Sequence, residues 1–364
     1  MRKTSIGRID QVIPDISYGD AVSNHALALR NELRNMGFES DIYALNIAPR
    51  LKYIIKEYKN FLAGNSRDVV IYHMATSSEM IFDIGKLKGV AKILNYHNVT
   101  PKEFFIGYSD AYFKACEDAR EQLKKAKDMF DYSFGDSEYN CIELRELGYK
   151  NVKELPILTH YDDYDKEPSE DIVRRFSDGN TNILFLGRIV PNKRQEDVIK
   201  SFYYYKRFLD KGSRLFLVGS YEGMELYYKT LKVLVKELEL KDVYFTGKVS
   251  FEEILAYYRT AHVFLSMSEH EGFCMPLIES MYFGVPIIAY KEAAIPYTLK
   301  DAGVMISSKD YLFIAGLLDS IVHDNKLRTS IIDGQSRRLA DFSYDRVASL
   351  FEENFMDILG VEND

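Results

Sequence analysis

Cysteine and long apolar runs are scarce in this chain. Its three cysteines, Cys116, Cys141 and Cys274, are odd in number and far apart, which argues against a disulfide framework and a zinc site and fits a reducing compartment. No apolar run approaches the roughly 18–20 residues that a membrane span needs. The first residues, MRKTSIGRID, have no apolar segment typical of a signal peptide. We therefore expect a cytoplasmic protein, at most peripheral on the inner face of a membrane.

Positive charge is also in deficit. The 47 Lys and Arg residues stand against 55 Asp and Glu residues, a formal net charge of −8, which argues against a general binder of nucleic acids or other polyanions. No G-x-G-x-x-G fingerprint follows the first expected strand of either half, which counts against an NAD-dependent oxidoreductase. At 364 residues, the chain is long enough for two domains with substantial cores.

Short apolar runs alternate with amphipathic stretches in both halves of the chain, a pattern typical of parallel sheets flanked by helices. The first half predicts strands at 6–13, 41–45, 69–72, 92–96 and 132–135, and helices at 21–36, 102–127 and 138–147. The second half predicts strands at 182–186, 214–218, 243–245, 263–265 and 285–289, and helices at 194–210, 222–238, 251–259, 324–340 and 344–358. Residues 156–180 are polar and acidic and are interpreted as a linker.

The most informative stretch is Phe264 to Ala289, FLSMSEHEGFCMPLIESMYFGVPIIA. Two apolar runs enclose a polar loop and a helix that should begin near Pro276 and end before Gly284. Glu271 lies in the loop and Glu279 one turn into the helix. Acids at a helix start are often only solvated, but a helix N-terminus also suits phosphate, and a nearby carboxylate can accept hydrogen bonds from sugar hydroxyls.

The motif Glu271-Gly272-Phe273-x-x-Pro276-x-x-Glu279, followed by Gly-x-Pro, resembles the signature of retaining glycosyltransferases of family 4, mannosyltransferases among them. The resemblance implies a GT-B fold: α/β, with two Rossmann-like doubly wound lobes and a cleft between them. It implies an acceptor-binding lobe at 1–165, a nucleotide-sugar-binding lobe at 180–342, and a helix at 343–364 that crosses back to the first lobe. In the family the first acid lies against the donor sugar and the second holds the ribose. The expected donor-binding residues of this stretch are Gly272, Phe273, Cys274, Met275, Pro276 and Glu279.

Two cations five residues apart, Arg188 and Lys193, follow the strand expected at 182–186. Surface cations are usually scattered, but strand ends of open α/β sheets are where ligands bind. The resemblance implies that this pair, with Gly187, binds the donor diphosphate, so that no metal or other cofactor is expected. Arg194 stands where the family usually has glycine, which adds charge beside the pair.

Five further positions follow strand ends. Gly19 and Gly219 would allow a close approach of the backbone to the donor, although a single glycine is more often an ordinary turn. His97 follows the strand at 92–96; such a histidine is often structural, but in the family a histidine at this point contacts the donor sugar. Lys248 and Val249 resemble the family's backbone contact to the nucleotide base.

The resemblance predicts a retaining hexosyltransferase that uses GDP-mannose or a UDP-hexose and a saccharide or lipid-linked acceptor, in cell-surface polysaccharide or glycan synthesis. His97, Arg188, Lys193 and Glu271 are the catalytic candidates. Two acids beside a sugar also suggest a glycosidase, but Glu279 is assigned to the ribose. The family is believed to use front-face attack, in which the departing phosphate helps to deprotonate the acceptor. The alternatives are a degenerate nucleotide-sugar-binding homologue and a GT-B sugar-nucleotide epimerase.

Residues 50–62 place Leu51, Ile54, Ile55 and Tyr58 at helical spacing among basic residues. This pattern predicts a basic amphipathic helix, either packed on the protein surface or in peripheral contact with an anionic membrane.

Overall fold

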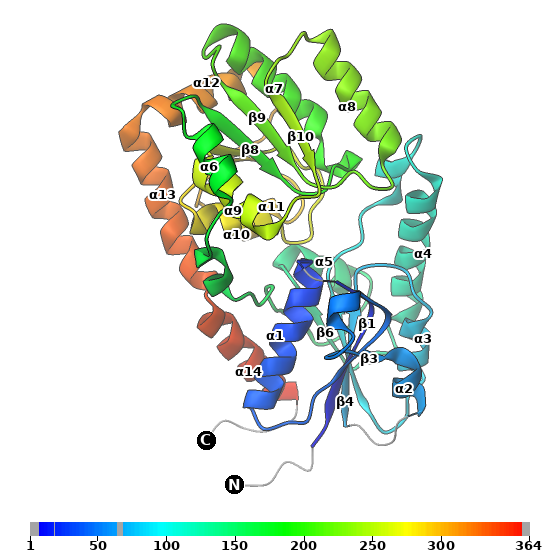
Figure 1. Cartoon of the computed structure of the whole chain (residues 1–364). Helices are drawn as coiled ribbons and strands as arrows, with labels where there is room; N and C mark the ends of the chain where they lie inside the picture. Colours follow the sequence, from blue (N-terminus) through cyan, green and yellow to red (C-terminus); the bar gives the residue numbers. More distant parts are fainter. Residues whose placement is uncertain (1–6, 18, 64–67, 359–364) are drawn as a thin grey trace. The chain divides into compact units, whose positions relative to one another are not determined.

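The computed structural model describes residues 7–17, 19–63 and 68–358 (Figure 1). By their contacts the residues divide into two compact units. Unit 1 comprises 1–102, 114–160 and 342–364, and unit 2 comprises 103–113 and 161–341. This division differs from the lobe limits expected from sequence, because 103–113 and 161–165 pack with unit 2.

Unit 1 is built on a parallel sheet with strand order β3-β2-β1-β4-β5-β6-β7. Its strands are β1 (Ile9–Ile16), β2 (Ile42–Ile47), β3 (Lys56–Glu57), β4 (Val69–Met74), β5 (Ala91–Tyr96), β6 (Tyr132–Gly135) and β7 (Val152–Glu154). Its helices are α1 (Ala21–Asn35), α2 (Tyr58–Ala63), α3 (Met80–Gly85), α4 (Asp110–Ala126), which begins in unit 2, α5 (Glu138–Glu146) and α14 (Tyr344–Ile358). The expected α/β class is confirmed.

Both faces of this sheet are buried, because successive side chains of a strand point to opposite faces. Val69 and Ile71 of β4 belong to a core formed with α1 and α14, where Phe351 is fully buried. Val70 and Tyr72 belong to a core formed with α2, α3 and α4. The helices accordingly lie on two sides of the sheet (Figure 1). Continuous apolar strands are what a parallel sheet covered on both faces requires.

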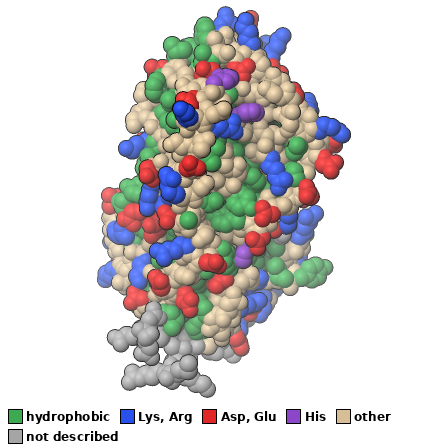
Figure 2. Space-filling view, turned by 90° about the vertical axis from the view of Figure 1, so that its left-hand side faces the viewer, with side chains coloured by type: hydrophobic (Ala, Val, Ile, Leu, Met, Phe, Trp, Pro, Cys, Tyr) green, Lys and Arg blue, Asp and Glu red, His purple; other side chains and the backbone are tan. Residues whose placement is uncertain are grey.

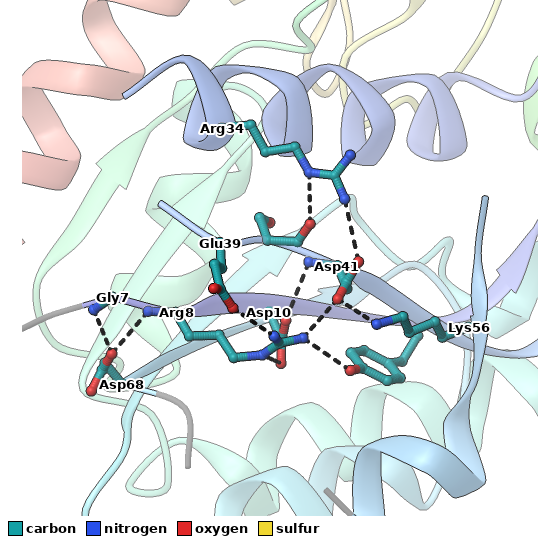
Figure 3. A network of polar contacts seen from close by, with 10 residues as sticks. Gly7, Arg8, Asp10, Arg34, Glu39, Asp41, Lys56 and Asp68 are labelled. Carbon is teal, nitrogen blue, oxygen red and sulfur yellow. Dashed lines mark hydrogen bonds and ion pairs between the residues drawn. The ribbon is translucent and has the colours of Figure 1, made fainter. Parts of the chain in front are cut away.

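A network of charged residues stabilises the amino-terminal edge of this sheet (Figure 3). The guanidinium of Arg8 donates to Asp10 at 3.0 Å, Glu39 at 3.1 Å and Asp41 at 2.7 Å. Burial alone would raise the pKa of Asp41, but hydrogen bonds from Lys56 and Arg8 outweigh it and the pKa is lowered. These charges lie at the edge opposite to the one where open α/β sheets bind ligands.

Unit 2 contains a second parallel sheet, with strand order β10-β9-β8-β11-β12-β13. Its strands are β8 (Asn182–Leu186), β9 (Arg214–Val218), β10 (Val243–Gly247), β11 (Val263–Ser266), β12 (Ile287–Tyr290) and β13 (Val304–Ile306). Its helices are α6 (Glu170–Phe176), α7 (Gln195–Phe208), α8 (Glu225–Glu237), α9 (Phe251–Thr260), α10 (Met275–Tyr282), α11 (Ile295–Leu299), α12 (Tyr311–His323) and α13 (Asn325–Leu339). The sequence prediction did not include β13 or α12.

The prediction of an amphipathic helix at 50–62 is wrong. The segment instead forms a 3-10 turn, η1 (Pro49–Leu51), then β3, then the start of α2. Lys56 and Glu57 pair with Tyr43 and Ala44 of β2, and strand pairing replaces the helical spacing on which the prediction depended. The helical spacing on which the prediction of membrane contact rested is therefore absent from this segment.

Two other predictions differ from the structure. The helix expected at 102–127 begins only at Asp110, after a short turn, η2 (Lys102–Phe105). The linker expected at 156–180 contains η3 (Tyr161–Asp165) and α6, and α6 packs against α9 of unit 2. Part of the expected linker is thus a component of a folded unit.

Surface charge is mixed on the face drawn in Figure 2, where Lys and Arg side chains are interspersed with Asp and Glu. Within residues 7–17, 19–63 and 68–358, no helix has both the length and the apolar character needed to cross a membrane.

Candidate active site

The strand order of unit 2 reverses between β8 and β11. The chain runs outward from β8 to β9 and β10 on one side, and from β11 to β12 and β13 on the other. Ligands of open α/β sheets bind at such a switch point, at the carboxyl ends of the strands. The loop after β8 carries Arg188 and Lys193, and the loop after β11 carries Glu271.

Several contacts hold these two loops together, and three of them involve Asn192 and Lys193. The Glu269 amide donates to the Asn192 carbonyl at 2.8 Å, and the Asn192 side chain donates to the His270 carbonyl at 2.9 Å. The third is an ion pair in which Lys193 Nζ lies 2.7 Å from Oε1 and 2.9 Å from Oε2 of Glu271. Asn192 was not singled out in the sequence, because its side-chain partner, the His270 carbonyl, lies 78 positions away.

The Lys193–Glu271 pair is largely buried, with side chains 17% and 10% exposed. Burial alone would lower the pKa of Lys193, but the charge of Glu271 outweighs burial and raises it. Lys193 is therefore a cation at neutral pH. An ammonium group has three donors, and Glu271 accepts two of them, so one remains for an anion.

Gly187 and Gly219 come close together at the ends of β8 and β9. Gly219 has φ +149°, and a Cβ atom there would lie 2.0 Å from the carbonyl oxygen of Gly187. At Gly187, a Cβ atom would lie 3.5 Å from Lys193 Nζ. A side chain at Gly219 would therefore collide with the backbone, whereas at Gly187 a Cβ atom would make only ordinary contact and the backbone conformation, φ +144°, is what favours glycine.

Arg188 is exposed, and Tyr112 lies against it. The guanidinium donates a hydrogen bond to the Tyr112 hydroxyl and lies 5.2 Å from its ring centroid. Tyr112 belongs to the segment 103–113, which packs with unit 2. The sequence assigned this segment to the first lobe and therefore could not predict the contact.

Helix α10 begins beside the ion pair. Cys274 precedes the helix with φ +70°, and Pro276 occupies its first turn, as expected. The carbonyl of Phe273 accepts a hydrogen bond from Thr298 at 2.7 Å, which fixes the approach to the helix. Burial raises the pKa of Cys274 well above its usual value, so the thiol is a poor nucleophile. Met275 is half-buried at the start of the helix.

Glu279 lies on the same helix and accepts hydrogen bonds from two tyrosines. Tyr164 of η3 donates to Oε1 at 3.0 Å, and Tyr258 of α9 donates to Oε2 at 2.7 Å. Burial raises the pKa of Glu279, and the two hydroxyls act against this increase. Neither tyrosine was predicted as a site residue; Tyr164 lay in the expected linker.

Arg194 adopts φ +51°, a conformation that favours glycine. Its guanidinium donates to Asp197 at 3.1 Å. The Asp197 side chain is fully buried and also accepts from Lys309 and Tyr311, each at 2.7 Å. Lys309 pairs in turn with Glu269 in the loop after β11. The extra cation beside Lys193 is thus neutralised within this network.

The expected base contact lies after β10, where Lys248 is exposed and Val249 half-buried. They precede a helix start closed by a capping box, in which Ser250 and Glu253 bond each other's backbone amides. Gly272 lies half-buried between Glu271 and the start of α10.

In unit 1, Gly19 follows β1 with φ +80° and is exposed. Asp20 caps α1, accepting from the amide of Ser23 at 3.0 Å and from its hydroxyl at 2.8 Å. The neighbouring Tyr18 lies outside the described residues. The local contacts of Gly19 are those of a turn into a helix.

His97 lies in a buried chain of hydrogen bonds in unit 1. The side-chain nitrogen of Gln11 donates to the Ala26 carbonyl. The side-chain oxygen of Gln11, 2.8 Å from His73 Nε2, therefore accepts from that ring. Burial keeps the pKa of His73 low, so its ring is neutral and Nδ1 is an acceptor. His97 Nε2 donates to this Nδ1 at 2.9 Å. His97 Nδ1 lies 2.9 Å from both carboxyl oxygens of Asp136, whose pKa burial raises. Both ring nitrogens of His97 are therefore engaged within unit 1.

In the described part of the chain, no group of three or more His, Cys, Asp or Glu side chains could hold a metal ion. Asp163 and Asp165 have an Asp-x-Asp spacing, which could suggest a metal site. Lys166 pairs with Asp163 at 2.6 Å, and Tyr282 donates to Asp165 at 2.6 Å. Metal independence stays a prediction.

Comparison with known proteins finds one matching family model and several relatives. Residues 167–338 match the model of glycosyl transferases group 1. A Campylobacter jejuni GalNAc-alpha-(1->4)-GalNAc-alpha-(1->3)-diNAcBac-PP-undecaprenol alpha-1,4-N-acetyl-D-galactosaminyltransferase is 28% identical over 169 residues, 45% of each chain. The serotype-specific mannosyltransferase WbdA of Escherichia coli is 23% identical over 328 residues, 88% of this chain and 38% of its own. The chain thus spans less than half the length of these relatives.

A solved structure shows the same fold. HepE of Anabaena in complex with UDP-glucose matches 96% of this chain and 99% of its own, with a TM-score of 0.76 and 14% identity. The two parallel sheets, each covered by helices, are those of GT-B proteins. The chain therefore has the GT-B fold, and its segment 167–338 is similar to glycosyl transferases group 1.

Proposed function

We propose that the protein is a retaining glycosyltransferase that moves a hexose from a nucleoside diphosphate sugar to a saccharide or lipid-linked acceptor. The observation that carries the proposal is the buried Lys193–Glu271 ion pair at the switch point of unit 2, inside the matched segment. GDP-mannose and UDP-hexoses are the proposed donors, and cell-surface polysaccharide or glycan synthesis is the proposed setting. The similarity to WbdA and to the transferase named for a PP-undecaprenol-linked saccharide supports this choice.

The chemistry follows from the charges that develop in the reaction. Cleavage of the bond between sugar and diphosphate places negative charge on the departing phosphate and positive character on the sugar ring. The remaining donor of Lys193, the guanidinium of Arg188 and the amino end of α10 would stabilise the phosphate. The carboxylate of Glu271 holds Lys193 in place and would lie beside the positive sugar. Removal of one such preorganised donor typically costs about 3 kcal/mol in the barrier.

The remaining residues have supporting parts in the proposal. Gly187 and Gly219 would leave room for the diphosphate, and Glu279 would accept from the ribose. Lys248 and Val249 would offer their backbone to the base. The contacts expected from sequence for Gly19 and His97, close approach to the donor and contact with its sugar, stay predictions. No metal is needed in this scheme, because protein cations stabilise the leaving group.

The test is release of nucleoside diphosphate from separate nucleotide sugars, with EDTA present, and analysis of the sugar product. We expect slow release from one donor, at least 100-fold slower in Lys193→Met and Glu271→Gln and unchanged in Arg174→Met, which removes an exposed cation from the same unit. No release of nucleoside diphosphate from any donor, together with no shift of the melting temperature by GDP or UDP, would favour a degenerate homologue. Isomerised donor as the product would favour an epimerase.

A further inference from the structure

Two tyrosine hydroxyls hold the carboxylate of Glu279, one on each oxygen. Tyr164 donates to Oε1 at 3.0 Å and Tyr258 donates to Oε2 at 2.7 Å. The three residues come from η3, α9 and α10, 115 and 21 positions apart along the chain. Contacts from three separate elements leave the carboxylate little freedom to rotate.

Aromatic packing fixes the hydroxyls in turn. The Tyr258 ring stacks on Phe283 at 5.0 Å with an interplanar angle of 9°. Tyr164 packs edge-on against the same Phe283 at 5.8 Å, and its ring is tilted against that of Tyr282 at 5.3 Å. Tyr258 and Tyr164 are only 1% and 6% exposed. Burial, and then the charge of Glu279, raises the pKa of both tyrosines far above neutrality, so both hydroxyls remain donors.

The count of lone pairs leads to a ligand geometry. An ionised carboxylate offers about four acceptor positions, two on each oxygen. The tyrosines use one on each oxygen, which leaves one on each oxygen for a ligand. Two neighbouring acceptors on a plane of fixed orientation match two neighbouring hydroxyls, as on the 2′ and 3′ carbons of a ribose.

We propose that Tyr164 and Tyr258 are positioning residues that orient Glu279 for bidentate recognition of the vicinal diol of the nucleotide ribose. The inference rests on the proposed function for the presence of a nucleotide at this site. It assigns a role to two residues outside the sequence motif, one of them in the expected linker. It also makes the site selective for ribose over 2′-deoxyribose.

The hydroxyls have a second effect, on charge. Glu279 must be ionised to accept from both ribose hydroxyls, and burial opposes ionisation. The tyrosine hydrogen bonds stabilise the carboxylate. Loss of one hydroxyl should raise the pKa of Glu279 further, so that nucleotide affinity begins to fall at a higher pH as the solution is acidified.

The experiment measures binding of UDP, GDP and their 2′-deoxy analogues by calorimetry. The variants are Tyr164→Phe and Tyr258→Phe. Tyr282→Phe is the matched control, because it removes a tyrosine–carboxylate hydrogen bond of the same aromatic cluster, to Asp165 instead of Glu279. A hydrogen bond to a charged group contributes about 1.5–3 kcal/mol, so we expect wild type to prefer ribose roughly 10-fold or more.

In each Glu279-facing variant, we expect the preference for ribose to fall to roughly 3-fold and the Kd of the ribonucleotide to rise roughly 3–10-fold. The Kd should also increase at a higher pH than in wild type, while kcat at saturating donor changes less than 2-fold. Tyr282→Phe should match wild type in all of these. If either buried tyrosine variant does not fold, the other one still tests the inference, since each contacts a different oxygen.

The outcomes separate the inference from the proposed function. If wild type prefers ribose and both variants keep that preference and the wild-type pH profile, the positioning role is overturned and the proposed function stands. If wild type binds no nucleoside diphosphate, the proposed function fails and the inference with it. If wild type binds ribo and deoxy forms equally, Glu279 does not recognise the diol and the inference is wrong, whatever the activity.

Discussion

Removal of one member of the Lys193–Glu271 pair should destabilise unit 2 far more than removal of both. Either single change leaves a charge without its partner at a site where the side chains are 17% and 10% exposed. Breaking a buried pair in this way costs about 3–5 kcal/mol, whereas replacing both members is often nearly neutral. We expect about 3 kcal/mol for Lys193→Met and for Glu271→Gln, the low end because some solvent reaches Lys193.

A double-mutant cycle measures this coupling. We expect the double variant Lys193→Met/Glu271→Gln to lose less stability than either single variant, which gives a coupling energy of at least about 3 kcal/mol. Urea denaturation is the assay; in thermal melts each single variant should lose about 6–12 °C, taking 2–4 °C per kcal/mol for a domain of this size. The coupling should persist in 1 M salt, because a buried pair is only weakly screened.

The control cycle uses Arg174 and Asp171 of unit 2, whose side chains are 80% and 86% exposed. Its coupling should be below about 0.5 kcal/mol and should vanish in high salt. A coupling below about 0.5 kcal/mol for Lys193–Glu271 as well would refute the reasoning. Lys193 would then be solvated and not neutralised by Glu271, and its orientation toward a phosphate would need another cause.

Two further predictions concern the backbone and the pH dependence. Gly219→Ala should lower the free energy of unfolding by more than about 3 kcal/mol in urea denaturation, because its Cβ would lie 2.0 Å from a carbonyl oxygen. The control, Gly316→Ala in α12, has open space around it and should stabilise by about 0.5–1 kcal/mol. Equal effects of the two substitutions would contradict the close approach at Gly219. Burial lowers the pKa of His25 and His73, so below about pH 6.5 the unfolded chain binds protons that the folded chain does not. Stability should therefore fall by about 1 kcal/mol per histidine as the pH falls from 6.5 to 5.5. Burial raises the pKa of Asp136, so its contribution to stability changes with pH in the opposite direction. A stability that does not change with pH in urea denaturation would contradict neutral buried rings.

Several site contacts escaped prediction for the same physical reason. Tyr164 was assigned to a linker because its neighbours are acidic and polar, yet its hydroxyl donates to the carboxylate of Glu279, 115 positions away. The ring of His97 was expected to face the donor sugar, and its two nitrogens bond Asp136 and His73. In both cases, the partner lies far away in the sequence and is set by the tertiary fold, which local periodicity does not encode.

The sequence alone determined the fold class and the motif segment. Apolar runs too short for helices, separated by amphipathic stretches, can be buried on both faces only in a parallel sheet. Pro276 and Gly284 set the limits of α10 because one lacks an amide hydrogen and the other tolerates φ +61°. These features depend on neighbours within a few residues.

Tertiary structure decided the rest. Residues 50–62 have helical spacing, but pairing of Lys56 and Glu57 with β2 made part of the segment a strand. Lys193 meets Glu271 across 78 positions only because β8 and β11 are adjacent at the point where the sheet reverses its order. Local propensity amounts to a few tenths of a kcal/mol per residue, whereas burial and pairing contribute several. The site is therefore set by the contacts that the fold imposes between distant residues.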